Sequence, residues 1–315
     1  MERRIKKKPI IIMAVSVLVV LIIGICIALY IKDKNYKKSY DYKLGVIGYN
    51  KDEIVSIKSL GQDQIDLILD HDYDKNIIEL VQRKYFLKKN LDKYLDYIKD
   101  NSDKSLDDVI AIINVGANKD WYTDYVDSDI SLNNLMLTNK FHRLSEDYNP
   151  DDLVDISNVY SYGENQKLKK DAYDAFIEMF NEAKKDNVTL IVNSSYRSYE
   201  IQDKTYSDYS SWYGVNEADK IAARPGFSEH QTGLAIDIMT YKANRNNFEE
   251  TDAFKWLENN AYKYGYILRY PKDKEYLTGY SYESWHYRYV GVDVASYIRD
   301  NNITYDEYYA FFVEK

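Results

Sequence analysis

The strongest constraint on this chain is a long apolar segment near its start. Residues 9–31 read PIIIMAVSVLVVLIIGICIALYI, and no charged side chain follows Pro9 until Lys32. About 20 apolar residues in a helix cross the hydrocarbon core of a bilayer, and this segment has no polar face to turn towards water. The sequence therefore predicts a transmembrane helix over residues 10–31.

The charges around this segment predict how it is oriented. Residues 1–9 carry five Lys and Arg side chains, which is typical of a cytoplasmic tail. Lys32 and Lys34, on the other side, weaken the contrast in charge. No A-x-A-like cleavage motif follows the apolar residues, which favours an uncleaved signal anchor over a secreted form. We therefore expect a single-pass membrane protein whose remaining chain lies outside the cytoplasm.

Composition excludes some classes of function. The chain has 315 residues, enough for one large domain or two small ones, and a formal net charge of −9. Binding to nucleic acid needs a basic surface that displaces counterions, so we expect no nucleic-acid partner. Cys26 is the single cysteine in the sequence, so the chain forms no internal disulfide.

The pattern of apolar residues changes twice along the rest of the chain. A polar juxtamembrane spacer is expected over residues 32–43, followed by a helical segment over 44–125 in which apolar residues recur every three or four positions. The helical segment shows no catalytic group, and the sequence leaves its role open. Residues 126–315 mix helices and strands and are expected to form one α+β domain. In it, a helix over 164–187 carries the stripe Leu168, Ala172, Phe176, Met179 and Ala183.

Several short strands predict a small, mostly antiparallel sheet flanked by helices. The strand-like segments lie within 188–198, 234–239, 266–271 and 284–290. They follow one another too closely for repeated parallel crossovers, which favours the antiparallel arrangement.

One of these strands, GLAIDIM, contains a carboxylate where apolar residues dominate. Strict alternation places Ile236 and Ile238 on one face and Asp237 on the other. A bare carboxylate in such a strand costs several kcal/mol, so Asp237 is expected to meet a metal ion or a cation. His230 lies on the loop that leads into the strand, where Gly226 and Gly233 permit tight turns.

A second histidine lies in a similar pattern, YESWHYRYVG. His286 alternates along a strand, and Glu283 precedes it by three residues. Two histidines and one carboxylate leave one position of a tetrahedral zinc ion open, which is typical of a catalytic site. The alternative is that the two histidines are unrelated and only hydrogen-bonded within the fold, and spacing alone leaves both readings open. His71 and His142 are interpreted as surface or packing residues.

Three motifs, in order, carry a resemblance to a known family. SEHQTGLAID resembles the SxHxxGxAxD signature of the VanY-type D-Ala-D-Ala carboxypeptidases, which are zinc peptidases of the LAS group. ESWH resembles the ExxH element of the same family, and SSYRSYEIQ resembles its SxYRSxxxQ segment. The resemblance covers about residues 130–300 and implies the LAS/Hedgehog-like peptidase fold.

The resemblance also implies roles for individual residues. One zinc ion would be held by His230, Asp237 and His286, with Glu283 as the general base for a zinc-bound water. Arg197 would hold the region of the scissile carbonyl. Gln202, Ser228, Tyr270 and Ser195 are expected at the substrate, although the family often has glycine at the position of Ser195.

The implied activity is removal of the C-terminal D-alanine from peptidoglycan stem peptides by a D,D-carboxypeptidase. An L,D-carboxypeptidase acting on tetrapeptide stems and a non-catalytic module that binds cell-wall peptides are the alternatives. No serine in the chain is followed by lysine at the third position, which argues against an acyl-enzyme mechanism.

Overall fold

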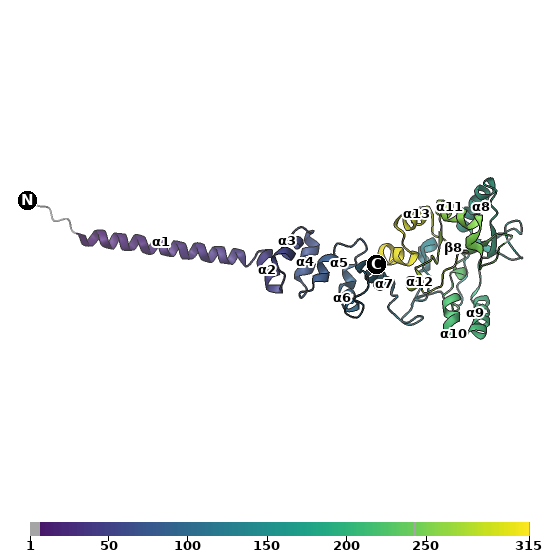
Figure 1. The fold of residues 1–315 in the computed structure, drawn as a ribbon, viewed down its shortest axis with the longest axis horizontal. Helices are drawn as coiled ribbons and strands as arrows, with labels where there is room; N and C mark the ends of the chain where they lie inside the picture. The colour runs from purple at the N-terminus through teal and green to yellow at the C-terminus, as the bar shows by residue number, and fades with distance from the viewer. Residues whose placement is uncertain (1–6, 242, 315) are drawn as a thin grey trace, which may run out of the picture. The chain divides into compact units, whose positions relative to one another are not determined.

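The structure is a computed structural model that describes residues 7–241 and 243–314, with side chains from residue 13 onward. The chain folds into two compact units, Met1–Leu91 and Asp92–Lys315. Figure 1 shows the order of the elements along the chain. Residues 1–6 of the predicted basic tail lie outside the described residues.

The first unit is helical. Asn50 and Glu53 form a capping box that starts the helix after residue 50, and Leu44, Ile57 and Ile68 are buried in the packing of these short helices. The prediction of helices in this part of the chain is confirmed. Its helices are α1 (Lys7–Tyr36), α2 (Tyr40–Ile47), α3 (Lys51–Lys58), α4 (Gln62–Leu69) and α5 (Lys75–Leu80).

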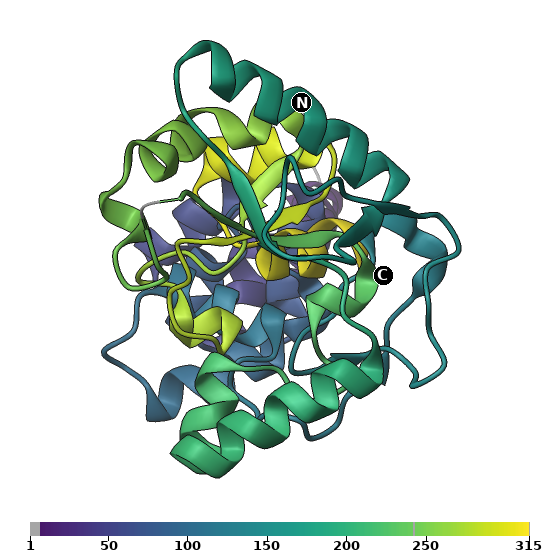
Figure 2. The same ribbon diagram turned by 90° about the vertical axis from the view of Figure 1, so that its right-hand side faces the viewer.

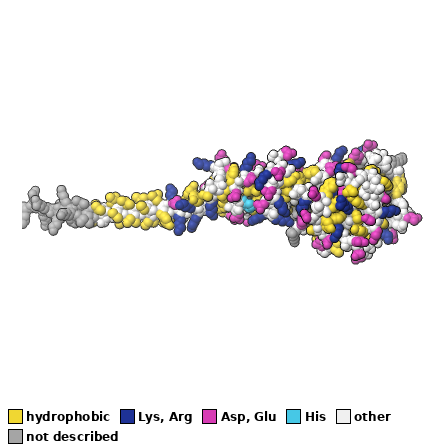
Figure 3. Space-filling model, turned by 90° about the horizontal axis from the view of Figure 1, so that it is seen from below, with side chains coloured by type: hydrophobic (Ala, Val, Ile, Leu, Met, Phe, Trp, Pro, Cys, Tyr) yellow, Lys and Arg dark blue, Asp and Glu magenta, His cyan; other side chains and the backbone are white. Residues whose placement is uncertain are grey.

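The predicted apolar helix is present in α1. Within the described residues, one segment, Met13–Tyr36, is long and apolar enough to cross a membrane, and its side chains are exposed. Figure 3 shows the hydrophobic side chains along this helix at the surface. A signal sequence near an N-terminus shares this length and composition.

The second unit contains the small antiparallel sheet that the sequence predicts. In the described residues its strand order is β5-β6-β8-β7, and each neighbouring pair is antiparallel. The strands are β5 (Ile191–Ser194), β6 (Ala235–Met239), β7 (Tyr266–Leu268) and β8 (His286–Tyr289). Two short strand pairs accompany it, β1 (Val126–Asp127) with β2 (His142–Arg143) and β3 (Leu153–Asp155) with β4 (Lys167–Lys169).

Helices lie on both sides of this sheet. Figures 1 and 2 show α8, α11 and α13 on one side and α9 and α10 on the other. The helices of the unit are α6 (Leu91–Asp100), α7 (Leu106–Val115), α8 (Lys170–Lys185), α9 (Tyr199–Tyr213), α10 (Val215–Ile221), α11 (Asp252–Asn260), α12 (Glu275–Thr278), α13 (Val292–Asn301) and α14 (Tyr305–Tyr308). The α+β class is confirmed.

The hydrophobic core lies between α8 and one face of the sheet. Phe176 and Met179 from α8 pack in one cluster with Ile236 and Ile238 from β6 and with Tyr287 from β8. Each side chain is at most 1% exposed. Because side chains alternate along a strand, the neighbours of these residues on β6 and β8 point to the opposite face, where α9 and α10 lie. Burial of one face therefore directs Asp237 and His286 to the other.

The start of α8 differs from the prediction. The helix begins at Lys170, and the three residues before it form β4, paired with β3 through Val154 and Leu168. Leu168 is still fully buried in the same core as Phe176, so its apolar position was predicted correctly but its secondary structure was not. A buried leucine one turn before a helix fits the helical period whether it lies in the helix or in a strand.

The boundary between the compact units also differs from the predicted limit of the domain at residue 125. Helix α7 belongs to the unit that holds the sheet, and the Tyr276 hydroxyl, on α12, donates a hydrogen bond of 3.0 Å to Asp108 of α7. The buried side chains Val109 and Ile112 on α7 need such a partner surface. Amphipathic periodicity shows that a helix has a buried face without showing what covers that face.

Candidate active site and metal centre

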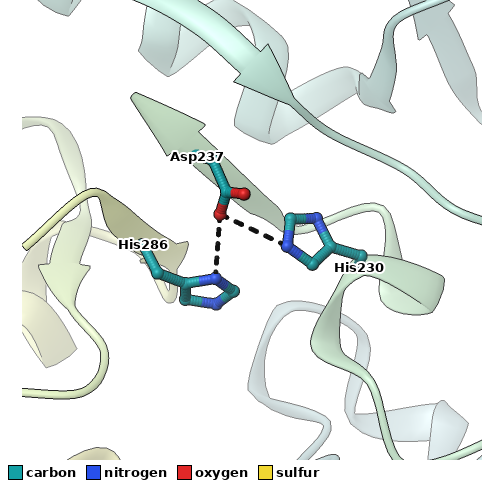
Figure 4. A group of neighbouring side chains, drawn as sticks. All are labelled: His230, Asp237 and His286. Carbon is teal, nitrogen blue, oxygen red and sulfur yellow. Dashed lines mark hydrogen bonds and ion pairs between the residues drawn. The ribbon is translucent and has the colours of Figure 1, made fainter. Parts of the chain in front are cut away.

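Three side chains converge on the face of the sheet opposite the core. Asp237 on β6 and His286 on β8 are directly paired across the two strands, so their side chains lie on the same face. His230 joins them from the 3-10 helix η3 (Glu229–Thr232) that leads into β6. Figure 4 shows the two rings turned towards the same carboxylate.

The distances among these side chains are short. Asp237 Oδ1 lies 3.4 Å from His230 Nε2 and 3.1 Å from His286 Nδ1. One ligand atom from each of the three residues lies within 4.8 Å of the others, and all three side chains are buried. Ligand atoms around a tetrahedral zinc ion lie about 3.3 Å apart, so a small shift would seat one ion among them.

Two glycines allow the loop to bring His230 to this place. Gly226 has a φ of 85°, and a Cβ there would lie 2.9 Å from Leu144 O. Gly233 has a φ of 70° and ends η3, where a Cβ would lie 3.0 Å from Leu153 Cδ2. Both positions combine left-handed backbone with a close approach of other atoms, so a larger residue is strained at either one. The prediction of tight turns at these glycines is confirmed.

The loop after β5 also holds His230. His230 Nδ1 lies 2.7 Å from Ser195 O, and the backbone N–H of Arg197 donates to His230 O over 3.2 Å. A ring nitrogen beside a carbonyl oxygen must carry the proton, which leaves Nε2 of His230 free to ligate a metal. A shift in register on β5 between Val192 and Ser194, beside Asp237, lets this loop turn towards the site.

Each of the other two ligands has a contact of its own beyond the site. Arg245 Nη2 donates to Asp237 Oδ2 over 2.9 Å, so the other carboxylate oxygen, Oδ1, faces the histidines. His286 Nε2 lies 3.4 Å from Glu229 Oε2, which leaves Nδ1 towards Asp237. Outer contacts of this kind fix ring orientation and tautomer in metal sites. The donor set and its outer contacts therefore fit one zinc ion.

Burial and neighbouring charges shift the pKa values of the side chains in the site. Burial lowers the pKa of His230 to about 4. Burial also acts to lower the pKa of His286, but its hydrogen bonds to Asp237 and Glu229 outweigh that effect and raise it to about 9. Burial raises the pKa of Glu283 to about 7, although His286 opposes the shift. In the metal-free protein, the site thus holds one neutral and one protonated imidazole near neutral pH.

The three metal-site residues line one cavity. Five of the other predicted site residues line it: Arg197, Gln202, Ser228, Tyr270 and Glu283. Ser195 is not among the residues that line the cavity. Its hydroxyl donates to Gln166 Oε1 over 2.6 Å and accepts from Lys167 N over 2.9 Å, so its side chain serves the neighbouring loop.

Two of these cavity residues have polar atoms without partners. Arg197 Nε and Gln202 Oε1 are buried and have no hydrogen-bond partner among the described residues. Gln202 is held in place by its amide nitrogen, which donates to Ala223 O over 2.7 Å. Both residues line the cavity, and a buried donor or acceptor without a partner costs free energy.

Glu283 lies next to the metal-site residues on the same cavity wall. Its Oε2 is 3.7 Å from His286 Nδ1, and its backbone N–H donates to Tyr270 O over 3.1 Å. The Tyr270 ring packs 4.9 Å from the His286 ring. The cavity thus places a carboxylate with a pKa near 7 beside the three ligands, as a general base requires.

The sequence analysis missed several residues of the cavity. Tyr209 lines the cavity from α9, seven positions after Gln202, and helical spacing would have placed the two on one face. Glu229 lies inside the SEHQTGLAID motif, and its charge beside the predicted ligand His230 could have indicated a place in the site. Arg245 and Trp285 line the cavity too, and for Arg245 no sequence pattern marks the contact with Asp237.

Comparison with known proteins agrees with this geometry. A model of the family described as "VanY: D-alanyl-D-alanine carboxypeptidase" matches residues 165–292. The YodJ protein of Bacillus subtilis strain 168 is 45% identical over 186 residues, which are 56% of this chain and 67% of YodJ. This chain belongs to the VanY family. The resemblance inferred from the three motifs is confirmed.

Two further carboxypeptidases are similar to the chain. A D-alanyl-D-alanine carboxypeptidase of Enterococcus faecium is 34% identical over 190 residues, which cover 58% of this chain and 59% of that enzyme. The solved structure of the LdcB LD-carboxypeptidase superposes with a TM-score of 0.56 at 41% identity, over 60% of this chain and 91% of that one. The match to LdcB confirms the peptidase fold of the second unit. The chain spans less than two thirds of the Enterococcus faecium enzyme.

We predict that the purified protein binds one zinc ion. His230→Ala or His286→Ala should weaken its affinity for zinc by more than about a hundredfold, because loss of an outer contact alone weakens affinity by up to about that factor. Since the metal must displace the proton of His286, affinity should rise with pH until about pH 9, its pKa in the metal-free protein. Calorimetric titration of the metal-free protein at several pH values measures both effects.

The matched control is His142→Ala. His142 hydrogen-bonds to Asn139 Oδ1 and packs on Tyr309, away from the three ligands. This variant should bind zinc as the unaltered protein does, and equal losses in all three variants would contradict the assignment of the site.

Proposed function

We propose that this chain is a zinc-dependent carboxypeptidase that removes the C-terminal D-alanine from peptidoglycan stem peptides. The observation that carries the proposal is the convergence of His230, Asp237 and His286 in one cavity with Glu283. When bound there, zinc supplies Lewis-acid polarisation of the scissile carbonyl and of the attacking water. The family of the chain and the motifs of the cavity support the same reaction.

Two protein side chains carry out the proton transfer and the charge stabilisation that hydrolysis needs. Glu283 accepts the proton of the attacking water and then delivers it to the leaving amine, so one group acts as base and acid in turn. In the metal-free protein, burial raises the pKa of Glu283 to about 7. Arg197 lines the cavity, and its guanidinium group stabilises negative charge that develops on the scissile carbonyl oxygen.

The other polar residues of the cavity orient the substrate. Gln202 and Ser228 both line the cavity and are polar residues that can hydrogen-bond to the end of the peptide. The Tyr270 ring packs at a tilt against the His286 ring and lines the cavity. In this arrangement the end of the peptide is held by hydrogen bonds while its last amide bond faces Glu283.

The first test is Glu283→Gln. This substitution keeps the shape of the side chain and removes its basicity, so kcat should fall at least about a hundredfold while bound zinc remains. Steady-state hydrolysis of a stem peptide and metal analysis of the same sample measure the two quantities. Glu250→Gln, which changes an exposed carboxylate, is the control and should retain full activity. Full activity in Glu283→Gln would remove this residue from the mechanism.

Two kinds of peptide bond are candidates for the bond that the enzyme cleaves. D,D cleavage of pentapeptide stems follows from the family and from the Enterococcus faecium relative. L,D cleavage of tetrapeptide stems is favoured by the LdcB structure, whose identity to this chain is 41% against 34% for that relative. The two activities release the same product, D-alanine, from stems of different length.

Incubation with a pentapeptide stem and a tetrapeptide stem, followed by mass spectrometry, separates these activities. We expect the pentapeptide to lose one D-alanine and to stop at the tetrapeptide. Faster conversion of the tetrapeptide to the tripeptide would assign L,D specificity instead. Hydrolysis of neither stem by zinc-loaded protein would leave the non-catalytic binding module as the function.

We also propose that α1 anchors the protein in the cell membrane and that the peptidase unit lies on the outer side. The apolar segment Met13–Tyr36 and a cell-wall substrate support this placement. Protease added to intact cells should then remove the peptidase unit and leave cytoplasmic proteins uncut. Protection of the unit until the cells are lysed would contradict the orientation.

A further inference from the structure

We propose that Glu229 is a positioning residue whose buried carboxylate holds the ring of His286 so that Nδ1 faces the metal. This inference rests on the proposed function only in that it assumes a metal at the three ligands. It assigns a role to a side chain that is neither one of the expected ligands nor the expected base.

The ring of His286 lies between two carboxylates. Asp237 Oδ1 is 3.1 Å from Nδ1, and Glu229 Oε2 is 3.4 Å from Nε2. Once Nδ1 binds a metal, the proton of the neutral ring must sit on Nε2, where Glu229 is the acceptor. A carboxylate in this position fixes the orientation of the ring and raises the electron density on the ligating nitrogen.

Glu229 is itself held rigidly by two buried cations. Arg269 Nε donates to Glu229 Oε1 over 2.7 Å, and Arg288 Nη1 lies 3.3 Å from the same oxygen. Glu229, Arg269 and Arg288 are at most 1% exposed. Two guanidinium groups beside one carboxylate stabilise its negative charge in the buried site. Oε1 thus serves the arginines, and Oε2 remains for His286.

The same network offers a control residue with no contact to the metal site. Asp306 accepts hydrogen bonds of 2.6 and 3.1 Å from Arg269, and its side chain is 2% exposed, nearly as buried as that of Glu229. Its other hydrogen bond, of 2.7 Å, comes from Asn139. Asp306 therefore shares the cation of Glu229 without touching His286. Any effect that comes only from an unbalanced buried arginine should appear in both positions.

The test compares Glu229→Gln with Asp306→Asn in the full chain. Zinc affinity is measured by competition with a chelator, and Co²⁺ is bound in a parallel sample to record its visible absorption. We expect Glu229→Gln to lower zinc affinity by about 10- to 100-fold and to shift the Co²⁺ bands, as the loss of an outer contact does. Asp306→Asn should lower the melting temperature of the metal-free protein and leave both readings unchanged.

A second variant covers the case in which Glu229→Gln does not fold. Glu229→Asp keeps the negative charge beside the arginines but shortens the side chain by one methylene, which withdraws its oxygen from His286. It should also weaken zinc binding. The proposal is overturned if a folded Glu229 variant binds zinc and Co²⁺ as the unaltered protein does, or if Asp306→Asn weakens both to the same degree.

These readings are separate from the test of the proposed function. Zinc affinity and Co²⁺ absorption require no substrate, so they report on Glu229 even if neither stem peptide is hydrolysed. Conversely, Glu283→Gln should lose activity without a change in zinc affinity or Co²⁺ absorption, because Glu283 is outside the ligand set.

Discussion

The pairing of β6 with β8 is the constraint on which the site depends. It sets Asp237 directly opposite His286, and the alternation of both strands sends Ile236 and Tyr287 into the core on the other face. A slip of one residue in this register would bury the carboxylate against α8 and expose the apolar side chains. The large free-energy difference between these two arrangements specifies the geometry of the ligands. The same register therefore sets both the burial of the core and the positions of Asp237 and His286.

A set of buried ion pairs connects the site to the C-terminal part of the second unit. Arg269 pairs with Glu229 next to the ligands and with Asp306 on α14, so a continuous set of charged contacts joins the C-terminal helix to His286. Such pairs are costly to desolvate and gain stability mainly from good geometry on every side. Removing one member leaves its partner unpaired in the interior. The network therefore stabilises the fold around the site, and Glu229 is the member of it that contacts His286.

The sequence indicated the three ligands through the family that its motifs resemble, because spacing alone left unrelated histidines as an alternative. Strand alternation placed Asp237 and His286 on definite faces, and the glycines around His230 marked the turn that precedes β6. The contact between Arg245 and Asp237 depends instead on where a loop returns in space, which no local pattern encodes. The start of α8 was misplaced because Leu168 satisfies the helical period while its backbone pairs with Val154. Local patterns thus predicted which residues are buried better than which partner buries them.

Two buried polar atoms without partners, on residues that line the cavity, bear on the kind of ligand that the cavity can bind. Leaving Arg197 Nε and Gln202 Oε1 buried without partners costs about 1–3 kcal/mol each in the free protein. A ligand that offers an acceptor to the first and a donor to the second recovers that cost, whereas an apolar ligand does not. A peptide backbone carries both groups in every residue. A peptide end could therefore satisfy both residues through its main chain, in agreement with the function proposed for the cavity.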